Sequence, residues 1–254
     1  MTIDDIDFNA LYKQHLIACN HYHLPPDKWD KKAPKMAENL VGKPSRYNAQ
    51  LMAAMQMQPN ETLLDIGCGP GTFAVPLAQH CRQVYALDYS TGMLAALAEF
   101  KHALKLDNLH LLHKSWADNW DDVPAADVVL ASRSTLVDDL DDMIAKLCAK
   151  AKKRVYLTSV TQRHFLDEGV FSAIGRDDVG FPTYIYLLNR LYQKGIQANL
   201  NFIETESGRF MGETYEDLLA SVEFSLGALN EQEKQRLAEF YRQKQQHNEP
   251  IKHG

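Results

Sequence analysis

Short apolar runs alternate with longer amphipathic segments through the middle of the chain. Five runs have the length of strands and little polar alternation, which is typical of strands covered on both faces of a sheet. They are residues 62–66, 83–87, 109–113, 127–131 and 154–159. Between them, apolar residues at helical spacing predict helices near residues 72–81, 91–104 and 138–152. This rhythm predicts a doubly wound, mostly parallel α/β sheet.

The pattern changes on both sides of this region. The third helix carries Met143, Ile144, Leu147 and Cys148 on one face, which we expect to be buried. After it, a helix near 182–194 leads to an alternating stretch at 198–203, which predicts a hairpin with 209–211 on the sheet edge. The hairpin brings the expected sheet to seven strands. Helices near 215–226 and 231–246 follow, and roughly the first 50 residues are predicted to be helical.

No repeat or flexible linker divides the chain. We therefore expect residues 1–50 to form an N-terminal helical cap and residues 213–254 to form C-terminal helices. Residues 51–212 are expected to form the α/β domain, with the helix near 182–194 inserted in it.

Composition narrows the partners and the location. The formal net charge is −6, from 27 basic and 33 acidic residues, which disfavours a large nucleic-acid footprint. The four cysteines have no paired metal spacing and are too few for a disulfide framework. The acidic N-terminus is unlike a signal peptide, and no apolar run approaches the roughly 20 residues that cross a bilayer. We expect a soluble, cytoplasmic protein with no membrane association.

A glycine loop follows the first predicted strand. The loop Asp65-Ile-Gly67-Cys-Gly69-Pro-Gly71 joins that strand to a helix. It lies at the carboxyl end of the strand, where open α/β sheets bind ligands. Asp88 ends the second strand, where a carboxylate can accept hydrogen bonds from a ribose diol. Together they predict a site for an adenosine-containing ligand. A dinucleotide fingerprint would need Gly or Ala where Thr72 stands, which disfavours a nicotinamide-dependent oxidoreductase.

The segment 65–71 resembles motif I of the class I S-adenosylmethionine-dependent methyltransferases. Ala86-Leu-Asp88-Tyr-Ser-Thr-Gly-Met93-Leu is similar to the segment that follows it in that family, and Trp29-Asp-Lys-Lys-Ala33 is similar to an opening found in many small-molecule members. The resemblance covers roughly residues 28–160. It implies a Rossmann-like methyltransferase fold and S-adenosylmethionine as cofactor, with S-adenosylhomocysteine as product.

The resemblance also implies which residues hold the cofactor. The glycines would pass the methionine moiety and ribose, Asp65 would stand near the amino group, Asp88 would hold the ribose, and Tyr89 and Met93 would lie beside adenine. Ser115 stands where members often place an acid, so Asp118 is an alternative adenine contact and Trp116 is expected to pack on the ring. The implied cofactor set is Asp65, Gly67, Cys68, Gly69, Gly71, Asp88, Tyr89, Met93, Ser115, Trp116, Ala117 and Ser132.

The sequence does not identify the acceptor or a general base. Arg133 and His164 follow the fourth and fifth strands, and we keep both as candidate substrate or catalytic contacts. An Asn-Pro-Pro-Tyr type motif, used by many members that methylate amino groups, is absent, which favours a small-molecule acceptor. The open alternative is a protein that binds S-adenosylmethionine without reacting.

Three other segments have ordinary interpretations. Cys19-Asn-His21-Tyr-His23 lacks a second cluster at metal spacing, so no metal site is expected. The basic run 150–154 is expected to end a helix on the side away from the cofactor. The tyrosine-rich stretch 184–192 either selects the substrate or packs as a plain helix.

Overall fold

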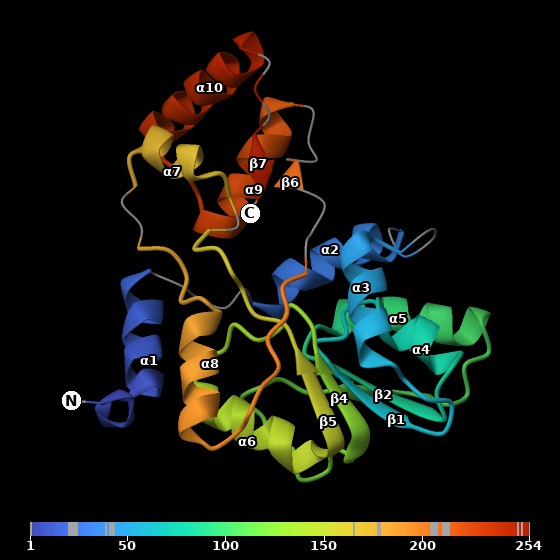
Figure 1. The fold of residues 1–254 in the computed structure, drawn as a ribbon. Helices are drawn as coiled ribbons and strands as arrows, with labels where there is room; N and C mark the ends of the chain where they lie inside the picture. Colours follow the sequence, from blue (N-terminus) through green and yellow to red (C-terminus); the bar gives the residue numbers. More distant parts are fainter. Residues whose placement is uncertain are drawn as a thin grey trace.

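The structure is a computed structural model. It describes residues 2–19, 25–38, 40, 44–164, 166–176, 179–203, 208–209, 214–247, 249 and 251–253. Five parallel strands form its sheet, in the order β3-β2-β1-β4-β5 (Figure 1). The strands are β1 (Thr62–Ile66), β2 (Gln83–Asp88), β3 (Leu109–His113), β4 (Ala126–Ala131) and β5 (Ala151–Leu157). In register, Ile66 lies beside Leu87 and Ala131, so the carboxyl ends of the three central strands meet at one edge.

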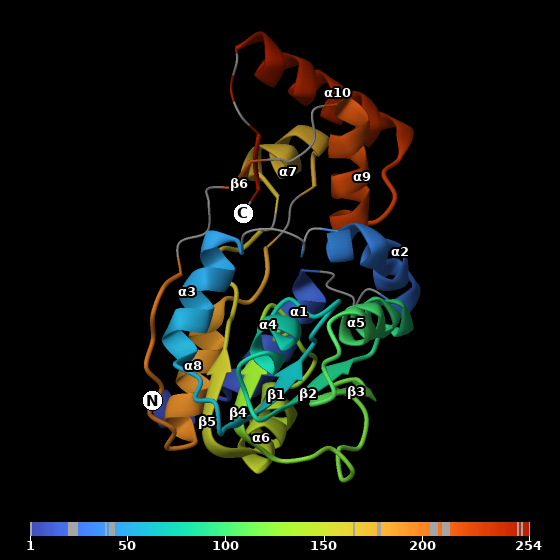
Figure 2. The ribbon, with the colours of Figure 1, turned by 90° about the vertical axis from the view of Figure 1, so that its right-hand side faces the viewer.

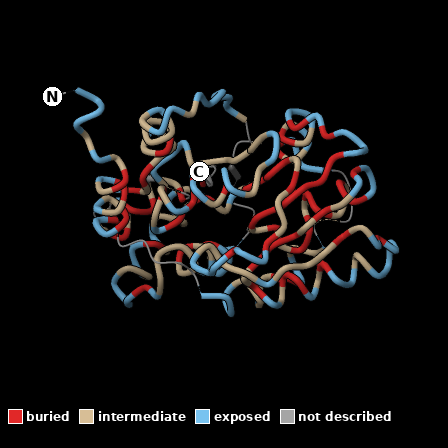
Figure 3. The backbone as a smooth tube through the Cα atoms, turned by 90° about the horizontal axis from the view of Figure 1, so that it is seen from below, coloured by how far each residue is buried: buried red, intermediate tan, exposed pale blue. Residues whose placement is uncertain are grey.

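Helices cover both faces of the sheet. Because successive side chains of a strand point to opposite faces, Leu63 packs with one layer and Leu64 and Ile66 with the other. The first layer contains α3 (Arg46–Met55), α4 (Ala74–Ala78) and α5 (Thr91–Ala103). The second contains α1 (Phe8–Ala18), α6 (Leu140–Lys150) and α8 (Tyr184–Gln193). Figure 3 shows the buried residues concentrated along the strands and on the inner sides of these helices. The doubly wound prediction is confirmed.

The prediction that a hairpin adds a sixth and a seventh strand to this sheet is wrong. Residues 198–203 form no strand; Leu200 and Phe202 are exposed, and only Ile203 of that stretch packs against the core. Residues 210 and 211 of the expected hairpin lie outside the described residues. The short strand β6 (Gly208–Arg209) pairs antiparallel with β7 (Lys252–His253) in a separate two-stranded sheet. The alternation predicted extended backbone but could not specify its hydrogen-bonding partner.

Two helix predictions need smaller corrections. Helix α6 buries Met143, Ile144 and Leu147, but Cys148 is exposed because it lies at the margin of the apolar stripe. The helix ends at Lys150, so the rest of the basic run belongs to β5. Helix α8 packs against α1 and α6, with Leu187 buried and the Tyr186 hydroxyl 2.9 Å from His15 Nδ1.

Three helices form a group beyond the carboxyl edge of the sheet. They are α7 (Glu168–Ile174), α9 (Tyr215–Leu226) and α10 (Glu231–Gln246). Their shared core includes Val170, Ile174, Val222 and Leu237. The chain leaves the sheet after β5, contributes α7 to this group, returns as α8 and then adds α9 and α10 (Figures 1 and 2).

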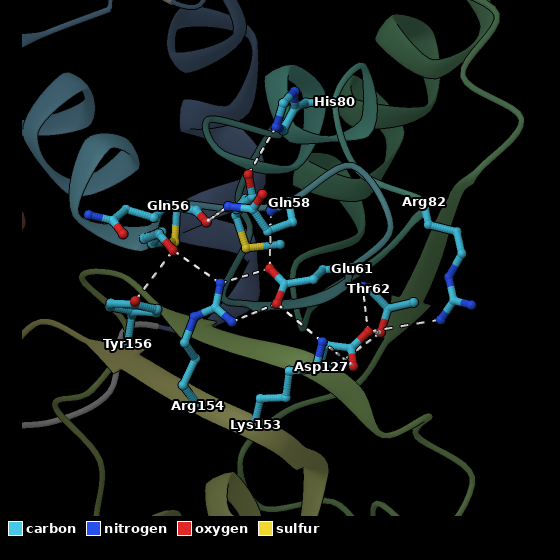
Figure 4. A network of polar contacts seen from close by, with 12 residues as sticks. Gln56, Gln58, Glu61, Thr62, His80, Arg82, Asp127, Lys153, Arg154 and Tyr156 are labelled. Atoms are coloured by element: carbon cyan, nitrogen blue, oxygen red, sulfur yellow. Dashed lines mark hydrogen bonds and ion pairs between the residues drawn. The ribbon is translucent and has the colours of Figure 1, made fainter.

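The amino edge of the sheet is held by a polar network (Figure 4). Glu61, just before β1, is only 3% exposed and accepts hydrogen bonds from both terminal nitrogens of Arg154 at 2.6 and 2.7 Å. Lys153 reaches Glu61 and Asp127 at 3.3 Å each. Asp127 also accepts from the backbone and hydroxyl of Thr62. These contacts join β1, β4 and β5 on the side opposite the glycine loop.

The remaining helices are a short 3-10 helix (Ile3–Asp5) and α2 (Pro26–Glu38). Helix α2 packs against α5 at the carboxyl edge of the sheet. No helix in the described ranges is long and apolar enough to span a membrane.

Candidate active site

The glycine loop turns from β1 to α4 through left-handed backbone. Gly67, Gly69 and Gly71 have φ of +68°, +54° and +103°, a region that side chains with a Cβ rarely adopt. A Cβ on Gly67 would lie 2.4 Å from the Cβ of Ser134, and one on Gly71 would lie 2.5 Å from Leu97 Cδ1. Gly69 has open space around it. Two of the glycines therefore permit close packing, and the third leaves the loop surface open to a ligand.

Asp88 fixes this loop from the end of β2. Its Oδ2 accepts a hydrogen bond from the Gly69 N–H at 2.8 Å, and its Oδ1 accepts from the Ser90 N–H at 2.9 Å. The side chain is buried, and burial raises the pKa of its carboxyl. The backbone of Tyr89 also donates to this carboxylate, which leaves one of its roughly four lone-pair sites for a hydroxyl. The residue thus joins the two loops that end β1 and β2.

Asp65 is the next-to-last residue of β1, directly before the loop, and is 1% exposed. It accepts a hydrogen bond from the backbone of Ala74, while its Oδ2 has no hydrogen-bond partner among the described residues. Burial, and then the nearby charge of Asp88, raise the pKa of Asp65 to about 7. A buried carboxylate with one oxygen that lacks a hydrogen-bond partner is suited to a cationic partner.

The loop after β3 is closed by its own side chains. Asp118 Oδ2 accepts from the backbone and hydroxyl of Ser115 at 2.6 and 3.0 Å. Trp116 stacks on Trp120 with ring centroids 5.0 Å apart, and its indole N–H donates to the Ser134 carbonyl at 2.8 Å. The loop after β3 is thereby tied to the loop after β4. Asp118 holds Ser115 in place, so the two residues that compete for the adenine contact in the sequence are hydrogen-bonded to each other.

The other implied cofactor positions differ in exposure. Cys68 is buried, and its thiol donates to the Gly69 carbonyl at 3.4 Å. Met93 is buried at the start of α5, whereas Tyr89 is half-buried and Ala117 is exposed. All follow the carboxyl ends of strands β1 to β3.

Helix α2 covers the loop that follows β2. Asp30 Oδ1 accepts from the Ser90 hydroxyl at 2.5 Å and from the Gly92 N–H at 2.8 Å. Trp29 donates a hydrogen bond to Tyr89, and its ring meets Phe224 of α9 edge-on at 5.7 Å. The sequence indicated this segment only through the family resemblance, since nothing local to Asp30 shows that it binds the start of α5.

A hydroxyl cluster lies where β4 and β5 end. The Tyr47 hydroxyl, from α3, is 2.7 Å from Ser132 Oγ and 3.0 Å from Thr158 Oγ1. Arg133 donates its backbone N–H to Thr158 at 2.9 Å, and its guanidinium lies 4.0 Å from the centre of the Tyr47 ring. Sequence reasoning named Ser132 and Arg133 but missed Tyr47 and Thr158. Tyr47 lies far away in sequence, and no local pattern distinguishes it from a core aromatic.

His164 follows β5 and contacts α7. Its ring packs against Phe171 of α7 with centroids 4.2 Å apart. The suggested metal segment falls mostly on residues 20–24, which are outside the described residues. Within the described part of the chain, no group of three or more histidine, cysteine or acidic residues is placed to hold a metal ion.

Fold and site together define a class of protein: a doubly wound α/β domain with a glycine loop after β1 and a buried acid at the end of β2, the arrangement in which open α/β sheets bind ligands. Residues 63–155, which run from β1 to β5, match the methyltransferase domain family. These residues form a methyltransferase domain, and the fold resembles that of the class I S-adenosylmethionine-dependent methyltransferases. The match favours a methyltransferase over a dinucleotide-dependent oxidoreductase.

Individual proteins are also similar to this chain. The chain is 78% identical over 254 residues to an uncharacterized protein of Haemophilus influenzae, covering 95% of that protein. It is 37% identical over 70 residues to the demethylmenaquinone methyltransferase of Oceanobacillus iheyensis, which covers 26% of this chain and 29% of that enzyme. The magnesium protoporphyrin IX methyltransferase of Synechocystis, solved with bound S-adenosylhomocysteine, has a similar fold, with a TM-score of 0.51 and 18% sequence identity. The superposition covers 79% of this chain and 94% of that enzyme.

Proposed function

We propose that this protein transfers the methyl group of S-adenosylmethionine to a small molecule. The observation that carries the proposal is the left-handed glycine loop bonded through Gly69 to the buried carboxylate of Asp88. That pairing leaves backbone without Cβ atoms beside two carboxylate oxygens, which fits a ribose joined to a thioether chain.

The cofactor contacts follow from this placement. The open oxygen of Asp65 would accept from the cofactor's ammonium group, and Asp88 would accept from the ribose hydroxyls. Tyr89 and Met93 would lie on one side of the adenine ring. The loop after β3, which Trp116 bonds to the loop after β4, would lie on the other side of the ring. The full proposed set is Asp65, Gly67, Cys68, Gly69, Gly71, Asp88, Tyr89, Met93, Ser115, Trp116, Ala117 and Ser132.

The chemistry is an in-line displacement. A lone pair of the acceptor forms a bond to the methyl carbon, the carbon–sulfur bond breaks, and its electrons neutralise the sulfonium to give S-adenosylhomocysteine. Alignment supplies most of the rate, and a base is needed only if the acceptor carries a proton. Residues 132–134 lie against Gly67 through Ser134, so this loop would face the reacting methyl group.

A covered site supports the small-molecule acceptor. Trp29 and Lys32 of α2 both contact Phe224 of α9, with the Lys32 Nζ 3.0 Å from the ring centre. In this proposal residues 1–50 and 213–254 flank the domain 51–212. Helix α2 of the first segment and α9 of the second close over the carboxyl edge of the sheet, whereas α1 packs on its face. The net charge of −6 further opposes a nucleic-acid substrate.

Two measurements test the proposal. Calorimetric titration with S-adenosylhomocysteine should show one site per chain. Labelled S-adenosylmethionine should then transfer its methyl group to a small-molecule extract and not to total RNA or protein. Absence of binding by folded, ligand-free protein would reject the cofactor site. Binding without transfer to any pool would favour a non-catalytic binding protein, and label in RNA or protein would reject the small-molecule acceptor.

A further inference from the structure

Arg133 carries its charge without a carboxylate partner in the described part of the chain. Arg82, Arg154, Arg176 and Arg190 each pair with a carboxylate. Among the residues that the structure describes, no carboxylate forms an ion pair with Arg133. The residue is exposed, and its guanidinium lies over the Tyr47 ring. A guanidinium stacked on an aromatic face keeps its N–H donors directed outward and available.

The backbone around Arg133 is fixed in an uncommon conformation. Arg133 has φ of +56°, which costs a residue with a Cβ of order 1 kcal/mol. Its N–H donates to Thr158, and the neighbouring Ser132 and Ser134 bond to Tyr47 and to the Ile66 carbonyl. The flanking bonds hold the arginine where β4 ends.

The position of the Arg133–Tyr47 pair points to a ligand. Tyr47 packs edge-on against Phe73, at the end of the glycine loop, with ring centroids 6.4 Å apart. Ser134, next to Arg133, contacts Gly67. The guanidinium therefore lies beside the end of the site where the cofactor's methionine moiety would meet an acceptor.

We infer that Arg133, stacked on Tyr47, binds a carboxylate at the methyl-transfer end of the site. The inference rests on the proposed function for the location of the ligand. A planar guanidinium can donate two parallel hydrogen bonds to a carboxylate. That carboxylate belongs either to the methionine moiety of the cofactor or to the acceptor, and the two sources are separated by experiment.

The first arm uses S-adenosylhomocysteine and its analogue without the carboxylate. Methionine, like arginine, has a Cβ, so Arg133→Met and the wild type have the same backbone strain at this left-handed position. If the cofactor supplies the carboxylate, Arg133→Met weakens S-adenosylhomocysteine binding about tenfold and leaves the analogue unchanged. Arg133→Lys retains part of the affinity because it keeps the charge without the fork. Arg242→Met, on exposed α10, is the matched control and leaves both affinities unchanged.

The second arm tests the acceptor. A Haemophilus influenzae small-molecule extract is divided on an anion exchanger, and each pool is incubated with labelled S-adenosylmethionine. If the acceptor supplies the carboxylate, S-adenosylhomocysteine binds the wild type and Arg133→Met alike. Label then enters the anionic pool with the wild type and falls about tenfold with Arg133→Met, with Arg133→Lys between them.

The inference is overturned if both proteins bind both ligands alike and the label in the anionic pool does not depend on Arg133. A wild type that labels neither pool contradicts the proposed transfer, and the first arm then decides the carboxylate site by itself. No transfer together with unchanged affinities rejects both proposals.

Discussion

At the scale of single residues, Asp88 serves both the loop and the proposed ligand. Asp88→Ala removes the acceptor of the Gly69, Tyr89 and Ser90 N–H groups. It also removes the proposed ribose contact, so we expect S-adenosylhomocysteine binding to weaken by about 1–3 kcal/mol. Calorimetry measures this change. Asp107→Ala, an exposed acid in a loop, is the control. Unchanged affinity in a folded Asp88→Ala protein would remove Asp88 from the site.

Asp65 should make the stability of the ligand-free protein depend on pH. Its pKa is raised from 3.8 to about 7, so the folded state holds the proton more tightly than the unfolded chain. The stability that this proton provides is complete below about pH 4 and is lost as the pH rises through 7. Relative to Asp65→Asn, the wild type should lose of order 4 kcal/mol across that range in urea unfolding. A constant difference between the two proteins would contradict the raised pKa.

At the scale of elements, Glu61 joins strands at the amino edge. Glu61→Gln leaves Arg154 without its carboxylate, so we expect the free energy of unfolding to fall by about 2–4 kcal/mol at neutral pH. The pKa of Glu61 is lowered to about 2, mainly by Arg154, so this stability is present above about pH 4.5 and is lost as the pH falls through 2.

Urea unfolding of Glu61→Gln, Arg154→Met and the double variant measures the coupling. The double variant should lose less than the sum of the two single losses. Affinity for S-adenosylhomocysteine should stay unchanged because the network lies at the edge opposite the glycine loop. Additive losses would show that the ion pair does not couple these strands.

The elements differed in how well the sequence predicted them. Strands and the glycine loop follow from local patterns: buried runs, and glycines where the backbone needs positive φ. The bonds of Asp30 to α5 and of Tyr47 to β4 and β5 join distant segments, so no local pattern contains them. The alternating residues 198–203 are predicted as a strand from a local pattern and form none. A strand-like sequence forms a strand only where a neighbouring strand provides hydrogen-bond partners.

At the scale of the whole molecule, Phe224 couples the C-terminal helices to α2. Phe224→Ala removes the Trp29 and Lys32 contacts, and an aromatic pair contributes about 0.5–1.5 kcal/mol. We therefore expect α2 amides to exchange hydrogen faster and S-adenosylhomocysteine to dissociate about two- to tenfold faster. Exposed Phe202→Ala is the control. Unaltered exchange in α2 would show that α9 does not hold this helix.

The route of the chain through α7 sets an order of events on the ribosome. Val170 and Ile174 find their apolar partners in α9 and α10, and Leu237 is made roughly 60 residues after Ile174. At a synthesis rate of about 5–20 residues per second, that interval is roughly 3–13 s. The five strands are complete by Leu157, so we expect the sheet to fold before α7 packs against α9 and α10. Nascent chains that end at residue 200 and continue into a flexible linker long enough to span the ribosomal exit tunnel should resist protease across the sheet and be cut within 166–176. Protection of α7 in them would contradict this order.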